Sequence, residues 1–149
     1  MTPFVETIPA EAVVVDVRWY LDGRDGRAAY EQGHIPGAVW VDLDHDLAAH
    51  DRPATEGRHP LPTPEHFAAA MGRLGITRTT TVVAYDDTGG LTAGRLVVML
   101  RWLGVPAAVL DGGLAAWTAA GHDLETGPGR TPTHAHFEPA PWPHDRLAT

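Results

Sequence analysis

The chain has 149 residues, of which 44% are hydrophobic and 20% charged, values typical of a single globular domain. Its 19 acidic and 11 basic residues give a net charge of -8, which argues against binding to nucleic acid or to an anionic membrane surface. Cysteine is absent, which excludes disulfides, thiolate metal sites and a thiol nucleophile. The sequence contains neither a membrane-spanning apolar run nor a secretory signal, so we expect a cytoplasmic location.

The first part of the chain predicts two strands separated by a short helix. The apolar run at 12–17 is typical of a buried parallel strand. An Asp- and Gly-rich turn then leads into a short helix at 27–32, and a Pro-Gly turn precedes a second strand at 38–41. The following stretch, 43–62, is rich in Asp, His, Arg and Pro, and we expect it to be irregular.

Helices and strands alternate in the second part of the chain. Thr63 and Pro64 are favourable first residues for a helix that Gly75 would end. The remaining elements are expected in the order of a strand at 81–85, a helix closed by Gly104, a strand at 107–110 and a helix at 114–120. This alternation predicts βαβ units, and hence an α/β fold with a mostly parallel sheet covered on both faces.

The last 24 residues differ from the rest. From Glu125 onward the sequence holds five prolines and no periodic apolar pattern. We therefore assign 1–125 to one domain and 126–149 to an extended arm or inter-domain linker that leads toward something else. Trp117 is expected in the core, whereas four other tryptophans are candidates for burial against a second domain: Trp19, Trp40, Trp102 and Trp142.

A polar loop follows the strand at 81–85 and precedes a helix, the position where open α/β proteins place their chemistry. It consists of Asp86, Asp87, Thr88, Gly89, Gly90 and Leu91. Asp86 and Asp87 stand where a nucleophile or a bound anion would be expected. We interpret them as structural, with one carboxylate accepting the N–H groups of the loop in place of an anion. The alternative is an aspartyl nucleophile or metal site, for which Arg95 is the only nearby basic residue.

Other polar patterns give weaker indications of function. The run from Asp42 to Asp46 resembles the first motif of haloacid-dehalogenase phosphatases and the opening of a calcium loop. Leu47 occupies the position where a calcium loop needs Gly, and the chain has no Lys for the phosphatase chemistry. The nine His residues lack the spacing of a zinc site, so we expect no metal and no cofactor. Asp16 and Arg18 are interpreted as a structural charge pair at a strand end.

The segment Tyr30-x-x-x-His34-Ile35-Pro36-Gly37-Ala38-x-x-Val41 resembles the N-terminal signature of rhodanese-type sulfurtransferases. Further motifs of that family stand in the same order, at 15–18, 58–62, 83–86 and 110–117, so that the resemblance covers roughly 10–125. It implies a rhodanese-like three-layer α/β/α fold with a mostly parallel sheet of about five strands.

The resemblance is strongest to the N-terminal, non-catalytic domain of tandem thiosulfate/3-mercaptopyruvate sulfurtransferases. In that comparison Asp86 occupies the position of the family's catalytic Cys. Sulfur transfer needs a thiolate that can hold the sulfane sulfur, and a carboxylate cannot do this. Two adjacent carboxylates would also repel anionic sulfur donors. The resemblance therefore implies a chain that is inactive alone and shapes the active-site cleft of a C-terminal, Cys-bearing rhodanese domain, with small sulfur donors as substrates only in the intact protein.

Two further residues are candidates through the same resemblance. In the mercaptopyruvate branch, a His and an upstream acidic residue of the N-terminal domain are linked to the cleft between domains. His34 matches that His directly, and Asp25 matches the acidic residue by approximate spacing. The competing interpretation is that His34 fixes the turn before the strand at 38–41 through a backbone hydrogen bond. At the level of the whole chain, the alternatives are a free-standing binding or regulatory module and, with less support, a phosphatase of related fold.

Overall fold

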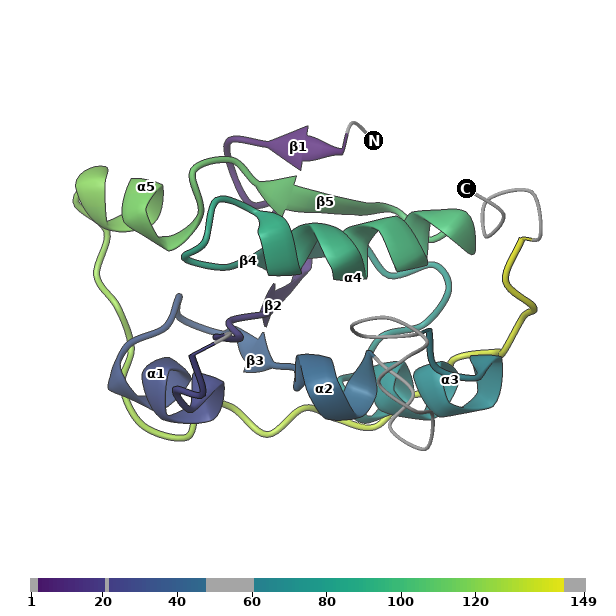
Figure 1. Cartoon of the computed structure of the whole chain (residues 1–149). Helices are drawn as coiled ribbons and strands as arrows, with labels where there is room; N and C mark the ends of the chain where they lie inside the picture. Colours follow the sequence, from purple (N-terminus) through teal and green to yellow (C-terminus); the bar gives the residue numbers. More distant parts are fainter. Residues whose placement is uncertain (1–2, 21, 48–60, 144–149) are drawn as a thin grey trace.

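A parallel five-stranded sheet runs through the residues that the computed structural model describes, 3–20, 22–47 and 61–143 (Figure 1). The strand order is β1-β5-β4-β2-β3. The strands are β1 (Phe4–Val5), β2 (Val13–Asp16), β3 (Val39–Trp40), β4 (Val82–Tyr85) and β5 (Ala107–Leu110). The helices are α1 (Gly26–Gln32), α2 (Leu43–Asp46), α3 (Pro64–Arg73), α4 (Leu91–Trp102) and α5 (Gly113–Ala119).

Two hydrophobic clusters cover the two faces of the sheet. Val15 and Val82 belong to the first cluster, whereas their neighbours Val14 and Val83 belong to the second. Successive residues of a strand point to opposite faces, so the clusters lie on opposite sides. Side chains of α2, α3 and α4 enter the first cluster, and those of α1 and α5 pack on the second. The expected three-layer α/β/α architecture with a parallel sheet of five strands is therefore confirmed.

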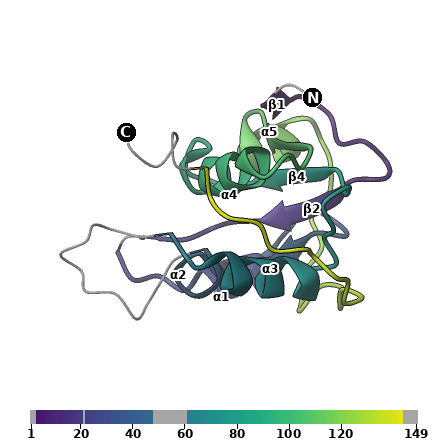
Figure 2. The ribbon, with the colours of Figure 1, turned by 90° about the vertical axis from the view of Figure 1, so that its right-hand side faces the viewer.

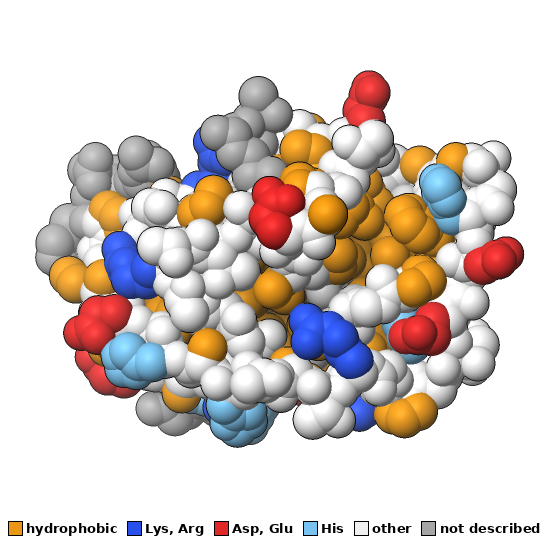
Figure 3. Space-filling model, turned by 180° about the vertical axis from the view of Figure 1, so that it is seen from behind, with side chains coloured by type: hydrophobic (Ala, Val, Ile, Leu, Met, Phe, Trp, Pro, Cys, Tyr) orange, Lys and Arg blue, Asp and Glu red, His pale blue; other side chains and the backbone are white. Residues whose placement is uncertain are grey.

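Two helices of seven residues each, α1 and α5, pack on the second face. Seen from the side opposite α4, hydrophobic side chains gather in one hollowed area, while Arg and acidic side chains lie scattered around it (Figure 3). Trp117 of α5 packs against the second cluster but stays partly exposed, so its expected core position is only half reached. None of the helices in the described ranges has the length and apolar character needed to cross a lipid bilayer.

Helix α3 begins and ends close to the residues that the sequence predicts. The hydroxyl of Thr63 accepts a hydrogen bond from the N–H of His66 at 3.1 Å, as expected of an N-cap. Pro64 occupies the first helical position, where its missing N–H costs nothing. The helix ends at Arg73, and Gly75 takes up the left-handed conformation with φ 81° just beyond it.

The stretch expected to be irregular starts with a helical turn, α2, and the prediction was wrong there. The cause is Asp42, whose side chain accepts from the N–H groups of Asp44 and His45 at 3.1 and 3.3 Å. This is the N-cap arrangement that stabilises a helix start. The rest of the stretch at 48–60, including most of the family motif at 58–62, lies outside the described residues.

Residues 126–143 contain no helix or strand, yet they run along the domain beside α3 (Figures 1 and 2). The N–H of Ala135 donates to the carbonyl oxygen of Gly72 at 2.9 Å. Phe137 and Trp142 are buried in the first cluster, and the indole N–H of Trp142 donates to Pro62 at 2.8 Å. Trp142 is therefore a core residue of this chain and not a candidate for a second domain. The boundary at residue 125 stays a prediction.

Candidate functional site

The strand connections define a crevice at the carboxyl ends of β2 and β4. These strands are neighbours in the sheet, but the chain leaves β2 toward α1 on the second face and β4 toward α4 on the first. Adjacent strands whose connections diverge in this way leave an opening between them, and open α/β sheets bind ligands at such a switch point. The topology therefore selects this edge of the sheet before any side chain is considered.

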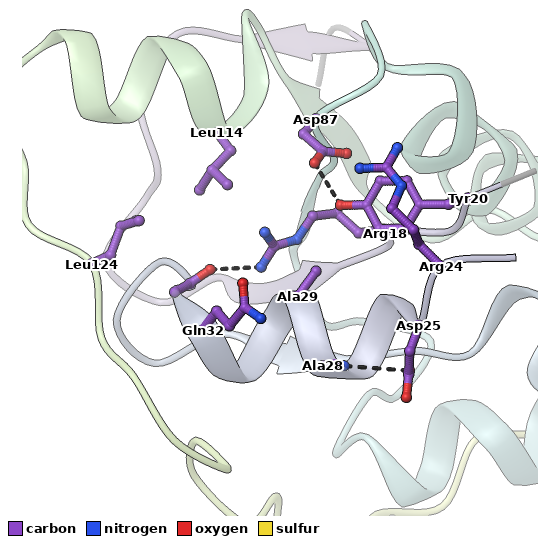
Figure 4. Close-up of a pocket in the computed structure, with 11 residues that line it drawn as sticks. Arg18, Tyr20, Arg24, Asp25, Ala28, Ala29, Gln32, Asp87, Leu114 and Leu124 are labelled. Atoms are coloured by element: carbon purple, nitrogen blue, oxygen red, sulfur yellow. Dashed lines mark hydrogen bonds between the residues drawn. The ribbon is translucent and has the colours of Figure 1, made fainter. Parts of the chain in front are cut away.

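A pocket of about 500 Å³ lies at this crevice (Figure 4). Its walls come from the segment after β2, from α1, from the loop after β4 and from the start of α5. The lining residues are Arg18, Tyr20, Arg24, Asp25, Ala28, Ala29, Gln32, Gly33, Asp87, Leu114 and Leu124. Two cations and two carboxylates thus meet apolar side chains in a space of the size that small molecules occupy.

Asp86 is buried at the end of β4, with 1% of its surface exposed. One oxygen, Oδ1, accepts from the N–H groups of Thr88 and Gly90 at 3.0 and 2.9 Å. The other, Oδ2, accepts from the N–H and hydroxyl of Thr92, both at 3.0 Å, and from the N–H of Ala93 at 2.8 Å. The N–H groups at a helix start have no intrahelical acceptor. This carboxylate supplies one, which confirms the structural interpretation of the loop.

Glycines allow the loop to close around that carboxylate. Gly89 and Gly90 have φ values of 76° and 90°, a conformation that side chains with a Cβ rarely adopt. On the neighbouring loop, a Cβ on Gly113 would lie 2.5 Å from the carbonyl oxygen of Asp86. The N–H of Leu114 donates to that same oxygen at 3.1 Å. We call the ring of donors around Asp86, formed by 88, 90, 92 and 93, the amide cradle.

The remaining loop residues lie at the surface. Asp87, Thr88, Gly89 and Leu91 are exposed, and Leu91 is 78% exposed. Asp87 accepts a hydrogen bond of 2.6 Å from the hydroxyl of Tyr20, which joins the loops after β4 and β2 across the crevice. Burial and this bond to Asp87 raise the pKa of Tyr20 to about 12. The guanidinium of Arg24 lies over the Tyr20 ring, 4.0 Å from its centroid.

A buried charge pair supports the floor of the crevice. Arg18 Nη2 lies 2.8 Å from Asp16 Oδ2, and the two side chains are 5% and 0% exposed. The hydroxyl of Tyr85 donates to the same carboxylate at 2.7 Å. Burial opposes the charge of Arg18, but the hydrogen bond and charge of Asp16 outweigh it and raise the Arg18 pKa. Burial, followed by the charge of Asp16, raises the pKa of Tyr85 strongly. The predicted structural pair is confirmed.

The structure does not bring His34 and Asp25 together. His34 is fully buried, and its Nδ1 donates to the carbonyl oxygen of Tyr30 at 2.8 Å. Its Nε2 lies 3.0 Å from Oε1 of Glu125, within hydrogen-bond distance. Asp25 lines the pocket but serves as N-cap of α1, accepting from Arg27 and Ala28 at 2.9 and 3.3 Å. A cleft-assisting role for either residue stays a prediction.

Acidic side chains of the run at 42–46 form hydrogen bonds that stabilise the fold. Asp42 caps α2, and Asp46 accepts from Arg73 at 2.8 Å. Arg95, considered as a partner for an aspartyl nucleophile, donates to the carbonyl oxygen of Leu47 at 3.2 and 2.8 Å. In the ranges that the structure describes, His, Asp and Glu side chains form no group of three or more that could hold a metal ion.

A family model supplies the observation that decides the identity of the fold. The model of the rhodanese-like domain matches residues 5–120. The chain belongs to the rhodanese-like domain family.

Relatives of this rhodanese-like domain are named as sulfurtransferases. The chain is 44% identical over 120 residues to the "Probable 3-mercaptopyruvate sulfurtransferase" of Pseudomonas aeruginosa, covering 78% of this chain and 42% of that protein. It is 41% identical over 120 residues to thiosulfate/3-mercaptopyruvate sulfurtransferase 2 of Arabidopsis thaliana, covering 78% and 34%. The solved 3-mercaptopyruvate sulfurtransferase from Leishmania major matches with a TM-score of 0.78 and 33% identity, covering 89% and 37%. The chain thus spans less than half the length of these relatives.

Four polar residues that line this rhodanese-like pocket were not predicted as site residues: Arg18, which was predicted only as part of a structural pair, Tyr20, Arg24 and Gln32. Tyr20 stands four residues after the end of β2, and Asp87 stands two residues after the end of β4. The carboxyl ends of parallel strands meet at one edge of the sheet, so polar residues shortly after each predicted strand were the available signal. The local sequences of β2 and β4, however, do not show that these strands are neighbours in the sheet.

Proposed function

We propose that this chain is a non-catalytic rhodanese-like domain of a thiosulfate/3-mercaptopyruvate sulfurtransferase. In this role it forms one wall of the active-site cleft of a Cys-bearing partner rhodanese domain. The observation on which the proposal rests is the amide cradle, which is complete and already filled by the carboxylate of Asp86.

The filled cradle explains why no sulfur would be transferred at this loop. A rhodanese-type reaction needs a thiolate that attacks the sulfane sulfur and then holds it as a persulfide. Backbone N–H groups at a helix start can stabilise such a thiolate. Here the N–H groups of the amide cradle donate to a buried carboxylate, which cannot form a persulfide and stands in the place of an incoming anion. The fold keeps the architecture of the reaction without its nucleophile.

Surface features at the crevice support the second part of the proposal. Leu91 is 78% exposed and lines a depression together with Trp19 and Tyr20, next to the main pocket. Leu124, on the other side of the main pocket, is 36% exposed. A domain packed on this edge would remove both apolar side chains from water. The relatives, in which this chain matches less than half the length, leave room for such a domain.

Turnover measurements test the catalytic half of the proposal. The chain is incubated with thiosulfate and cyanide, or with 3-mercaptopyruvate and a thiol acceptor, and product is compared with a protein-free control. We expect no product above the control. Turnover by the chain alone would contradict the proposal, because no Cys is present to carry the sulfur.

The partner half needs a separate test. If the source gene continues past codon 149 into a rhodanese domain with a Cys in its strand-to-helix loop, that domain is expressed with and without this chain. We expect kcat/KM for the sulfur donor to rise when this chain is attached. A stop codon at that point, or unchanged kinetics, would favour a free-standing binding module instead.

A further inference from the structure

A second pocket lies on the second face of the sheet, between the segment after β1 and helix α5. It encloses about 320 Å³ and shares no lining residue with the pocket at the crevice. Its walls are formed by Glu6, Thr7, Ile8, Leu110, Asp111, Ala116, Trp117, Ala120 and His122. We propose that it binds a small alkylammonium ion, with the charge beside the two carboxylates and the alkyl group against Trp117. This inference goes beyond the proposed function, because it concerns a different site and involves no sulfur transfer.

The pairing of β1 with β5 places the two carboxylates of this pocket next to each other. These strands are parallel, with Val5 opposite Leu110. The backbone pairing continues beyond the strands, because the N–H of Asp111 donates to the carbonyl oxygen of Val5 at 2.7 Å. Glu6 and Asp111 therefore occupy the next positions on two adjacent chain segments, which in a sheet are separated by about 4.8 Å. Both side chains line the pocket.

Neither carboxylate is neutralised by a cationic side chain. Within the described residues, the side chains of Glu6 and Asp111 form no hydrogen bond and no ion pair. No Arg is among the lining residues, and the chain has no Lys. Like charges at directly opposite positions of neighbouring strands destabilise a sheet. A cation bound beside both carboxylates would remove this repulsion, so the pocket has an electrostatic reason to favour a positively charged ligand.

Trp117 presents its ring, and not its N–H group, to a ligand. The indole N–H already donates to the carbonyl oxygen of Asp123 at 2.9 Å. The imidazole of His122 lies against the indole, with the centroids 4.4 Å apart and the planes inclined by 31°. An indole ring attracts cations through its π electrons. Ile8 and Leu110 add aliphatic surface to the same pocket, on the face whose hollowed apolar area is seen in Figure 3. These walls suit a cation that carries an alkyl group.

The charge of the chain sets the sign of the ligand and the strength of binding. The net charge of -8 adds to the attraction for a cation and repels the corresponding anion. Both carboxylates are exposed, so water and salt screen their attraction. We therefore expect millimolar affinity for a monovalent alkylammonium. An uncharged molecule of the same shape gains only the apolar contacts and should bind more weakly.

Butylammonium and butan-1-ol form a matched pair of probes, because they carry the same alkyl chain and differ in charge. Each is titrated at pH 8, where an alkylamine is protonated, into the full chain labelled with nitrogen-15. NMR shifts of the Trp117 indole N–H and of the Asp111 amide are followed. We expect saturable shifts with butylammonium, binding of butan-1-ol that is weaker by about tenfold, and no binding of butyrate. Absence of saturable shifts with butylammonium, or equal binding of butan-1-ol, would overturn the proposal.

Substitutions of the two carboxylates test the assigned residues. Glu6→Gln and Asp111→Asn are each expected to weaken butylammonium binding about threefold to fivefold. Glu11→Gln is the matched control, since it removes the same charge from an exposed residue outside the pocket. Equal effects of all three variants, or no effect of either pocket variant, would overturn the proposal. Without ligand, Glu6→Gln should unfold at the same or a higher urea concentration, because a repelling charge is removed. A lower urea midpoint would also overturn the proposal, because Glu6 would then stabilise the fold and not be free for a ligand.

Discussion

Asp86 is a buried carboxylate that the fold tolerates because residues close to it in the chain donate hydrogen bonds to both of its oxygens. Five donors reach its two oxygens, and all of them come from the seven residues that follow. A buried carboxylate without such partners would be costly, whereas one that satisfies a helix start stabilises the loop. The carboxylate that fills the amide cradle therefore organises the loop.

Replacement of Asp86 by Asn tests that structural role. The amide keeps the shape but offers one acceptor oxygen, and its NH₂ group would face donors of the cradle. We expect the free energy of unfolding to fall by about 2–4 kcal/mol. Urea unfolding measures the change, with the exposed neighbour in Asp87→Asn as control. If both variants unfold at the same urea concentration, Asp86 does not hold the loop.

Tyr20 provides a pH-dependent signal of the contact across the crevice. Its pKa of about 12 in the folded chain lies above the value of about 10 for an unfolded chain. The stabilisation linked to this shift is complete below about pH 10 and is lost as the pH rises through about 12. Tyrosinate absorbance measures the titration, and Tyr20→Phe assigns it. Asp87→Asn should move the Tyr20 pKa toward 10, and an unchanged titration in that variant would show that Asp87 does not contribute.

At the scale of residues, a contact could be predicted from the sequence only where its two partners lie close together along the chain. The bonds of Asp86 were foreseeable in kind, because a carboxylate before a helix has donors within a few residues. The partner of Tyr20 lies 67 residues away, and that of His34 lies 91 residues away. Neither pairing leaves a local pattern, so the sequence indicated a role for His34 but not the carboxylate of Glu125 that lies beside it.

At the scale of elements, caps and apolar runs gave the right helices and strands where the local signal was strong. β5 matches its predicted range of 107–110, and the cap at Thr63 starts α3 as expected. β1 was missed because it has two residues and gains its stability from pairing with β5. The packing of 126–143 was missed for a related reason, since a segment without periodicity can still contribute single buried anchors.

The anchor Trp142 offers an element-scale prediction. Its ring packs against Phe67 and Trp102, with centroids 5.2 and 6.3 Å away. Trp142→Ala should lower the free energy of unfolding by about 3–4 kcal/mol, because it leaves a cavity in the first cluster. His136→Ala is the matched control from the same segment, as this side chain is 80% exposed. Equal stability of both variants would mean that the segment is a simple linker in solution.

At the scale of the whole molecule, the sheet topology brings the relevant groups to one edge. Diverging connections from β2 and β4 open the crevice, and Arg18, Tyr20 and Asp87 reach it from different strands. The order of the strands was not predicted, because local patterns do not encode which strands are neighbours in the sheet. What results is a rhodanese-like domain with a buried carboxylate in the loop after β4 and two exposed apolar side chains, Leu91 and Leu124, beside the crevice.

The most direct test of this account is the thiol pKa of an Asp86→Cys variant. If the amide cradle is an anion site that Asp86 fills, a Cys thiolate placed there should be stabilised, with a pKa of about 7 or below instead of about 8.5. The pH dependence of thiolate absorbance gives the value, and Asp87→Cys, outside the cradle, should titrate near the ordinary value. A pKa at or above 8.5 for Asp86→Cys would contradict the account, because the loop would then have no capacity to hold an anion.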